Sequence, residues 1–141
     1  MKIESIMTTA IISVEMDDTL EVVKDIFDNA KIHHLLVIED ELLVGVLSDR
    51  DLYRAISPNI GTNRYTFKDI ETLKKRVHTV MTRKPTVLSR HASILEAVHI
   101  FNSNQFSCIP IVDESGNIEG IVTWRDIMRI LPDLIPPLSE E

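Results

Sequence analysis

The sequence predicts a mixed α/β (α+β) fold in which one small unit occurs twice. Apolar residues alternate between short strand-like runs and segments with helical spacing, and the second half of the chain repeats the order of the first. The chain has 141 residues, 44% of them hydrophobic, which allows one moderate core or two small ones. We therefore expect two repeats of strand, helix, strand, strand and helix, related by a pseudo-twofold axis and packed sheet to sheet.

The duplication extends along the whole unit. Met7-Thr8 recurs as Met81-Thr82, and the same spacing aligns four apolar pairs: Leu20 with Ile94, Ile26 with Ile100, Phe27 with Phe101, and Val37 with Ile111. After an insertion near Ser115-Gly116, a second set of matches follows: Gly45, Arg50, Asp51 and Arg54 with Gly120, Arg125, Asp126 and Arg129. Chance does not readily supply agreement over this length, so the pattern indicates a duplicated unit.

The first repeat is expected over residues 1–56. A strand is predicted at 11–14. Thr19 then has the chemistry of a helix N-cap, and it precedes apolar residues at helical spacing, namely Leu20, Val23, Ile26, Phe27 and Ala30. Strands at 34–39 and 42–47 are separated by Asp40-Glu41, which predicts a tight hairpin turn. A closing helix is predicted at 49–56.

The second repeat, residues 80–131, is expected to follow the same order. It begins with a strand at 86–88 and a helix at about 93–105, whose inward face carries Ile94, Ala97, Val98 and Phe101. Strands at 108–112 and 118–122 flank a glycine-containing loop, and a helix is predicted at 124–131. Pro132, Pro136 and Pro137 are expected to end helical structure and to begin a C-terminal tail, residues 132–141.

A connector at 57–79 joins the repeats. Its first residues, 57–63, have the composition of a loop. Thr66 is a candidate cap for a short helix that reaches about Val77, with Phe67, Ile70 and Leu73 on one face. The connector is therefore expected to be partly helical, and it is the segment most free to respond to a ligand or a partner.

The stretch from Gly120 to Asp126 is the strongest candidate for chemistry. Two β-branched residues end a predicted strand, and Thr123 fits the N-cap of the helix that follows. A helix start offers unpaired N–H groups and a positive dipole end, which suit an anion. The Asp126 carboxylate is suited to accept hydrogen bonds from a diol. The stretch from Gly45 to Asp51 has the same layout.

Other interpretations of these residues are open. Thr123 and Ser48 are suited to capping a helix whether or not a ligand exists. Asp126 and Asp51 can instead neutralise the arginines three residues further along each helix, Arg129 and Arg54. Arg125 and Arg50 can simply face solvent.

Composition and motif content argue against several classes of protein. The net charge of −7 argues against nucleic-acid binding, and no apolar run is long enough to predict a membrane span. The N-terminus does not resemble a secretion signal, and Cys108 is the only cysteine, so we expect a cytoplasmic protein. There is no phosphate-binding loop, no nucleophile–base pair and no metal-ligand spacing. His33 and His34 point to opposite faces of a strand and do not chelate one ion simply. We therefore expect no catalytic residues, no metal and no required cofactor.

The duplicated pattern resembles a tandem pair of cystathionine-β-synthase (CBS) domains, also called a Bateman module. The resemblance rests on Met-Thr before the first strand, on residues 106–113 (FSCIPIVD), and on the closing pattern of glycine, two apolar residues, Thr or Ser, and Asp. The first copy departs from the pattern with Leu36 in place of a usual proline and with Ser48 in place of the commoner threonine. The connector is similar to that of small stand-alone CBS-pair proteins.

In that family, such pairs bind adenine nucleotides or related adenosyl compounds in clefts between the repeats and regulate an attached or partner protein. Two modules commonly associate into a disc-shaped dimer. The resemblance therefore implies a regulatory module that senses AMP, ADP, ATP, NAD or S-adenosylmethionine, forms a homodimer and acts on an unknown protein effector. The alternative is a scaffold protein that dimerises through the same surfaces without a nucleotide.

The resemblance also implies two sets of ligand contacts. For the first cleft they are Asp126 on the ribose, Thr123 on ribose or phosphate, Arg125 near the phosphates and Ile121 against the base, with Thr8, Ser13, Ile32 and His33 from the opposite copy. For the second cleft they are Asp51, Ser48, Arg50 and Val46, with Thr82, Val87, Phe106 and Ser107. A carboxylate suits a diol, a hydroxyl and an arginine suit phosphate, and an apolar slot suits a purine.

Overall fold

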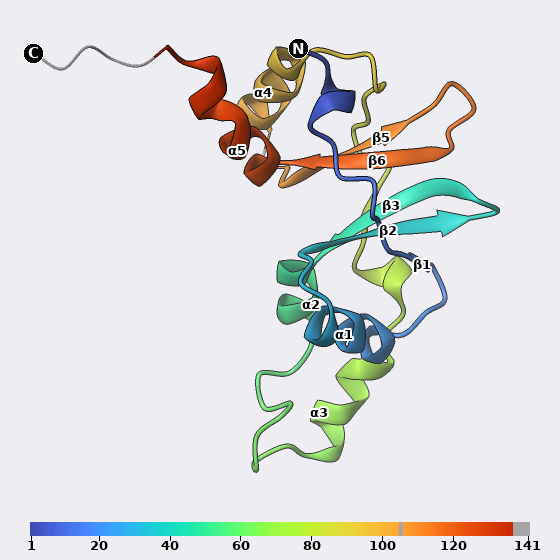
Figure 1. Ribbon diagram of the computed structural model, residues 1–141. Helices are drawn as coiled ribbons and strands as arrows, with labels where there is room; N and C mark the ends of the chain where they lie inside the picture. Colours follow the sequence, from blue (N-terminus) through green and yellow to red (C-terminus); the bar gives the residue numbers. More distant parts are fainter. Residues whose placement is uncertain (105, 137–141) are drawn as a thin grey trace, which may run out of the picture. The chain divides into compact units, whose positions relative to one another are not determined.

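The computed structural model of the chain describes residues 1–104 and 106–136. Its helices and longer strands follow the order expected from the duplication, and a two-residue strand at Thr82–Arg83, which was not predicted, is added (Figure 1). The first half contains β1 (Ser13–Glu15), α1 (Leu20–Asn29), β2 (His34–Glu39), β3 (Leu42–Ser48), α2 (Asp49–Ala55), α3 (Phe67–Glu71) and β4 (Thr82–Arg83). The second half contains α4 (Ile94–Ser103), β5 (Cys108–Val112), β6 (Ile118–Thr123) and α5 (Trp124–Leu134). Three 3-10 turns lie at Ile3–Ser5, Thr72–Lys74 and Val77–Thr79. The mixed α/β class expected from the sequence is confirmed.

The chain forms two compact units that are not identical to the two sequence repeats. Unit 1 combines Met1–Ile11 with Thr86–Glu141, and unit 2 is Ile12–Pro85. Each unit therefore contains the Met-Thr pair that precedes the other repeat in the sequence. Thr8 lies in the unit of Asp126, and Thr82 lies in the unit of Asp51.

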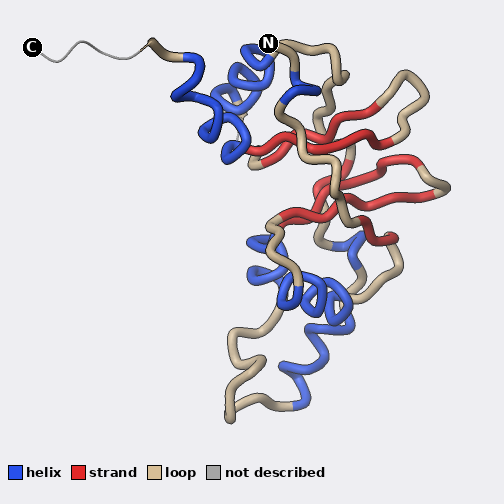
Figure 2. The backbone as a smooth tube through the Cα atoms, viewed as in Figure 1, coloured by secondary structure: helices blue, strands red, loops and turns tan. Residues whose placement is uncertain are grey.

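Unit 2 is built on a four-stranded sheet in the order β1-β2-β3-β4. β1 runs parallel to β2, and the other two pairings are antiparallel. α1 and α2 lie on one side of this sheet (Figure 2). Their inward residues join strand residues in a core that includes Leu20, Val23, Leu35, Leu47 and Leu52, all fully buried. The sheet thus fixes the end of β3, where α2 begins.

The β2–β3 hairpin has the tight turn predicted at Asp40-Glu41. Both residues have positive φ, 52° for Asp40 and 68° for Glu41. Two consecutive left-handed residues are typical of a type I′ turn, which matches the right-handed twist of the strands. Neither residue is glycine, so the turn is strained in unit 2.

Unit 1 repeats the hairpin with fewer paired strands. β5 and β6 are antiparallel, and Leu88 forms one isolated parallel bridge with Ile111. The strand predicted at 86–88 is therefore reduced to a single bridge. The core gathers residues from α4, α5 and both strands around Ile3 of the N-terminal segment, and Ile3, Ala97, Ile109, Ile111 and Val122 are fully buried within it.

Two helices end at other residues than the sequence predicts. α5 does not stop before Pro132 but continues through it to Leu134, because the proline loses only one N–H while the following turn still closes from the Ile135 N–H to the Leu131 carbonyl at 3.1 Å. α4 begins after Ser93, as predicted, and ends at Ser103. The part of the predicted helix at Gln105, together with Pro137 and residues 138–141 of the predicted tail, lies outside the described residues.

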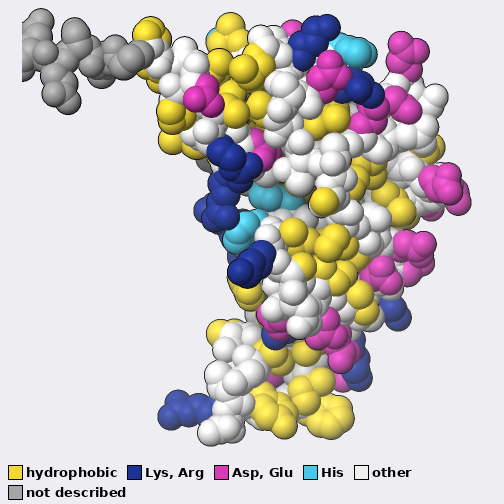
Figure 3. All heavy atoms as spheres, viewed as in Figure 1, with side chains coloured by type: hydrophobic (Ala, Val, Ile, Leu, Met, Phe, Trp, Pro, Cys, Tyr) yellow, Lys and Arg dark blue, Asp and Glu magenta, His cyan; other side chains and the backbone are white. Residues whose placement is uncertain are grey.

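The connector is partly helical, but it does not form one helix to Val77. α3 ends at Glu71, and 3-10 turns at Thr72–Lys74 and Val77–Thr79 follow. Leu73 packs on the core of unit 2, whereas Phe67 is 79% exposed. The expected common face is therefore wrong for Phe67, which occupies the first position of α3. Figure 3 shows hydrophobic side chains on the surface of this connector.

Candidate functional site: two matching helix starts

In unit 1, β6 passes directly into α5 at Thr123. The Thr123 Oγ1 atom accepts a hydrogen bond from the Asp126 N–H at 3.4 Å, and Asp126 Oδ2 accepts one from the Thr123 N–H at 2.9 Å. This reciprocal capping box satisfies two backbone donors that the helix itself leaves unpaired. The predicted N-cap role of Thr123 is confirmed.

Asp126 is the one charged side chain in the buried class within residues 1–104 and 106–136, with 4% of its surface exposed. Its second oxygen, Oδ1, accepts hydrogen bonds from the Thr8 hydroxyl at 3.3 Å and from Arg129 Nη1 at 3.4 Å. Burial of a carboxylate is costly unless it is hydrogen-bonded, and these partners supply the compensation. The alternative of an Asp126–Arg129 ion pair is therefore present in the structure.

Thr8 reaches Asp126 because the N-terminal segment pairs with β6. The Thr8 N–H donates to the Ile121 carbonyl at 2.8 Å, and the Ile121 N–H donates to the Thr8 carbonyl at 2.9 Å. Gly120 makes this approach possible, since a Cβ atom there would lie 2.8 Å from the Thr8 carbonyl oxygen. Close packing of the N-terminal segment against β6 thus explains why the repeated stretch begins with glycine.

Unit 2 has the same arrangement at the start of α2. The Ser48 N–H donates to Asp51 Oδ2 at 2.8 Å, and the Asp51 N–H donates to Ser48 Oγ at 3.1 Å, which forms a second capping box. Thr82 on β4 pairs with Val46 on β3, as Thr8 pairs with Ile121. A Cβ atom on Gly45 would lie 3.0 Å from the Thr82 carbonyl oxygen.

The two carboxylates have different surroundings. Asp51 is half-buried. Among the described residues, neither Thr82 nor Arg54 hydrogen-bonds to it. Within the described residues, Asp51 thus forms no ion pair with Arg54, unlike Asp126 with Arg129.

His33 lies beside the start of α2 through a residue that sequence reasoning missed. Its Nδ1 atom is 2.8 Å from Asp49 Oδ2, and its carbonyl accepts a hydrogen bond from the Asp49 N–H at 3.0 Å. Asp49 is the first helical residue after the Ser48 cap, where a carboxylate favours the helix dipole. The place of Asp49 directly after the predicted Ser48 cap could have identified it as a candidate from the sequence. No cluster of metal-ligating side chains occurs in the described residues.

The remaining predicted residues are divided between the units. Unit 2 contains Ser13 and Arg50, which are exposed, and Ile32, which is half-buried. Unit 1 contains exposed Val87, Ser107 and Arg125 and half-buried Phe106 and Ile121. The structure thus brings Thr8, Ile121, Thr123 and Asp126 together within unit 1. The grouping of either set with residues of the other unit stays a prediction.

The chain matches the CBS domain family at residues 3–58 and 77–133, and it belongs to that family. A CBS domain-containing protein of Dictyostelium discoideum is 26% identical over 141 residues, covering 99% of this chain and 97% of that protein. An inosine-5'-monophosphate dehydrogenase of Methanocaldococcus jannaschii is 28% identical over 129 residues. That match covers 91% of this chain but only 23% of the enzyme.

Solved structures agree with this assignment. CBSX2, a CBS-pair protein of Arabidopsis thaliana, has a crystal structure in complex with AMP. It aligns with a TM-score of 0.77 at 25% identity, covering 94% of this chain and 97% of that chain. The cytosolic domain of the Mg²⁺ channel MgtE, solved in complex with ATP, aligns with a TM-score of 0.71 at 25% identity, covering 92% of this chain and 48% of that chain. No helix in the described ranges is long and apolar enough to cross a bilayer.

Proposed function

We propose that this protein is a regulatory module that binds an adenine nucleotide or a related adenosyl compound at the Thr123–Asp126 helix start. The observation that carries the proposal is the buried Asp126 carboxylate, which is held beside two hydroxyl groups, those of Thr8 and Thr123. Membership of the CBS family and the AMP and ATP complexes of CBSX2 and MgtE support the adenine nucleotide as ligand.

The hydrogen bonds that Asp126 Oδ1 accepts within the protein are long enough for the hydroxyl groups of a ribose to replace them. Those from Thr8 and Arg129 are 3.3 and 3.4 Å long, at or beyond the ordinary range. A cis-diol that donates two short hydrogen bonds to the carboxylate replaces them at little cost. The displaced Thr8 hydroxyl and the Arg129 guanidinium then remain available as donors to phosphate oxygens.

Neighbouring residues supply the other contacts of this site. Ile121 is half-buried and pairs with Thr8, and we assign it an apolar contact with the purine. We assign Arg125, in the first turn of α5, to the phosphates. We assign Ser13, Ile32 and His33 to the same site. The second site uses Asp51, Ser48, Arg50 and Val46, with Thr82, Val87, Phe106 and Ser107.

Regulation follows from differential binding. CBS-domain pairs are generally regulatory modules, and in the inosine-5'-monophosphate dehydrogenase relatives the matching region is a small part of the protein. A ligand that prefers one arrangement of the module shifts its population and so alters the activity of a protein partner. We infer that this chain acts by the same principle on an effector protein.

An apolar stripe along α5 supports a homodimer. Trp124 and Met128 are 39% and 59% exposed, and half-buried Leu131 follows three residues later in α5. Spacings of four and three residues are those of the seam between two packed helices. Trp124 is held in place by its ring contact with Phe101, at 4.8 Å between centroids. A second copy of the chain is the occupant that we propose for this stripe, and Met128→Glu is expected to shift the sedimentation coefficient from dimer to monomer.

The deciding experiment is calorimetric titration of the protein, freed of carried-over nucleotide, with AMP, ADP, ATP, NAD and S-adenosylmethionine. We expect saturable binding of at least one ligand and a loss of about tenfold or more in Asp126→Asn, with Asp51→Asn as the matched variant. Asparagine keeps the size of the side chain and its acceptor for the N-cap. If the folded protein binds none of these ligands, the proposal is wrong and the scaffold alternative gains support.

A further inference from the structure

Residues 1–8 form a strap on unit 1. Ile3 is fully buried in the core of this unit, and its N–H donates to the Ala92 carbonyl at 2.8 Å. The Glu4 N–H donates to the Arg90 carbonyl at 3.1 Å, and the far end of the strap pairs with β6 through Thr8. The strap is therefore attached at both ends.

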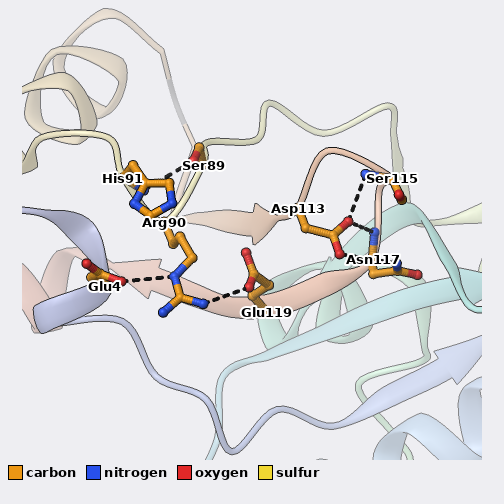
Figure 4. Close-up of polar contacts among 8 residues, drawn as sticks. All are labelled: Glu4, Ser89, Arg90, His91, Asp113, Ser115, Asn117 and Glu119. Atoms are coloured by element: carbon orange, nitrogen blue, oxygen red, sulfur yellow. Dashed lines mark hydrogen bonds and ion pairs between the residues drawn. The ribbon is translucent and has the colours of Figure 1, made fainter.

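Arg90 links the strap to β6 with its side chain. Its Nε atom donates to Glu4 Oε2 at 2.9 Å, and its Nη1 atom donates to Glu119 Oε2 at 3.2 Å (Figure 4). The hydrogen bond from Arg90 lowers the pKa of the Glu4 carboxyl below its ordinary value. Figure 4 shows the guanidinium between the two carboxylates, one from each segment.

This link and the Thr8–Ile121 pairing join the same two segments. Glu119 and Ile121 are two residues apart on β6, and the pairing of β6 with β5 shifts register at Glu119. Glu4 and Thr8 are four residues apart on the strap. The strap is therefore joined to β6 on both sides of Gly120, through Arg90 at Glu119 and through Thr8 at Ile121. Thr8 also donates a hydrogen bond to Asp126.

We propose that Arg90 is a positioning residue that holds the strap against β6 and thereby keeps the Thr8 hydroxyl at Asp126. The part of this inference that concerns nucleotide rests on the proposed function. If the ligand needs the Thr8 hydroxyl beside Asp126 as a donor to its phosphate, then strap attachment and ligand affinity raise one another through thermodynamic linkage. The strap leads directly into unit 2 at Ile12, so its attachment is a route by which ligand occupancy reaches the other unit.

The first test needs no ligand. Arg90→Gln removes the charge and both strong hydrogen bonds, and hydrogen exchange then reports on the strap directly. We expect the amides of Thr8 and Ile121 to exchange about threefold to tenfold faster, while the amides of Ser48 and Asp51 in unit 2 are unchanged. Arg83→Gln, which alters an exposed arginine of unit 2, is the matched control. Unchanged exchange at Thr8 in Arg90→Gln overturns the proposal.

The second test is a double-mutant cycle on AMP affinity. We expect Arg90→Gln alone to weaken binding about threefold and Thr8→Val alone about tenfold. In the double variant, Arg90→Gln should add nothing, because it acts through Thr8. Equal weakening in both backgrounds, or none in either, contradicts the positioning role. If the wild-type protein does not bind AMP or the other ligands, the proposed function fails while the exchange experiment still decides whether Arg90 holds the strap.

Discussion

The helix starts of α5 and α2 have the same local design and different surroundings. Each has a strand-to-helix junction, a hydroxyl cap and an aspartate that completes a capping box. Asp126 is buried and receives further hydrogen bonds from Thr8 and Arg129, whereas Asp51 is half-buried and receives none from Thr82 or Arg54 within the described residues. Duplication therefore preserved the junction, while packing made the two carboxylates different. The Asp126 site is the more pre-organised of the two.

Glycine substitutions test the shared part of the two junctions and have the largest expected effect. At Gly120 a new methyl group meets the rigid Thr8 carbonyl at 2.8 Å, whereas at Gly45 the nearest atom, at 2.6 Å, is the sulfur of the flexible Met81 side chain. We expect Gly120→Ala to lower the free energy of unfolding by about 3 kcal/mol and Gly45→Ala by about 2 kcal/mol. Urea denaturation of both variants measures the difference. The reverse order would show that the strap yields more easily than β4.

Matched aspartate substitutions test the part that differs. Asp126→Asn loses the ion pair with Arg129 and changes the acceptor for Thr8, and Asp51→Asn alters only the capping box. The expected losses of unfolding free energy are about 2 kcal/mol and about 1 kcal/mol, respectively. Thermal denaturation without ligand is the measurement. Equal losses would mean that the contacts of Asp126 with Thr8 and Arg129 contribute nothing to stability.

The hairpin turns allow a further comparison. Unit 2 turns through Asp40-Glu41, both with positive φ, and unit 1 uses a longer loop in which the left-handed residue is Gly116, with φ of 88°. Glu41→Gly removes steric strain from the shorter turn and is expected to stabilise the protein by about 1 kcal/mol. The control is Glu114→Gly in the longer loop, where φ is not positive, which should be neutral or slightly destabilising. A stabilising effect of both changes on the melting temperature would rule out this explanation.

The smallest expected effect is the pH dependence of the strap. Hydrogen bonding to Arg90 lowers the pKa of Glu4 from its ordinary value of 4.5, with smaller contributions from the charges of His91 and Lys2. A depressed folded-state pKa gives stability that is present above 4.5 and is lost as the pH falls through the folded-state value. Glu119 shares Arg90 and limits the effect of Glu4 alone. The strap amides of the wild type and Glu4→Gln should differ in exchange near pH 6 and converge at low pH. A constant difference would contradict this account.

Local features of the fold were predictable because they depend on residues close in the sequence. The caps at Thr19 and Thr123 were predicted from a hydroxyl before an apolar helical pattern, and the two-residue turn was predicted from its position between two strands. Pro132 misled the prediction, since one missing N–H near the end of a helix is tolerated. The capping pattern placed Asp126 and Asp51 correctly in the first turns of helices, and their contact with a ligand stays a prediction.

The sequence by itself determined the duplication, the order of the main elements, the helix caps at Thr123 and Ser48 and membership of the CBS family, because periodicity, capping and motif spacing are properties of each repeat. Only the tertiary structure decided that Thr8 joins Asp126, that Arg90 links Glu4 to Glu119, and that Asp126 is buried while Asp51 is not. These contacts join residues far apart in the chain. They depend on which strand edge a segment pairs with and on how much of each side chain packing then covers, and no local pattern encodes either.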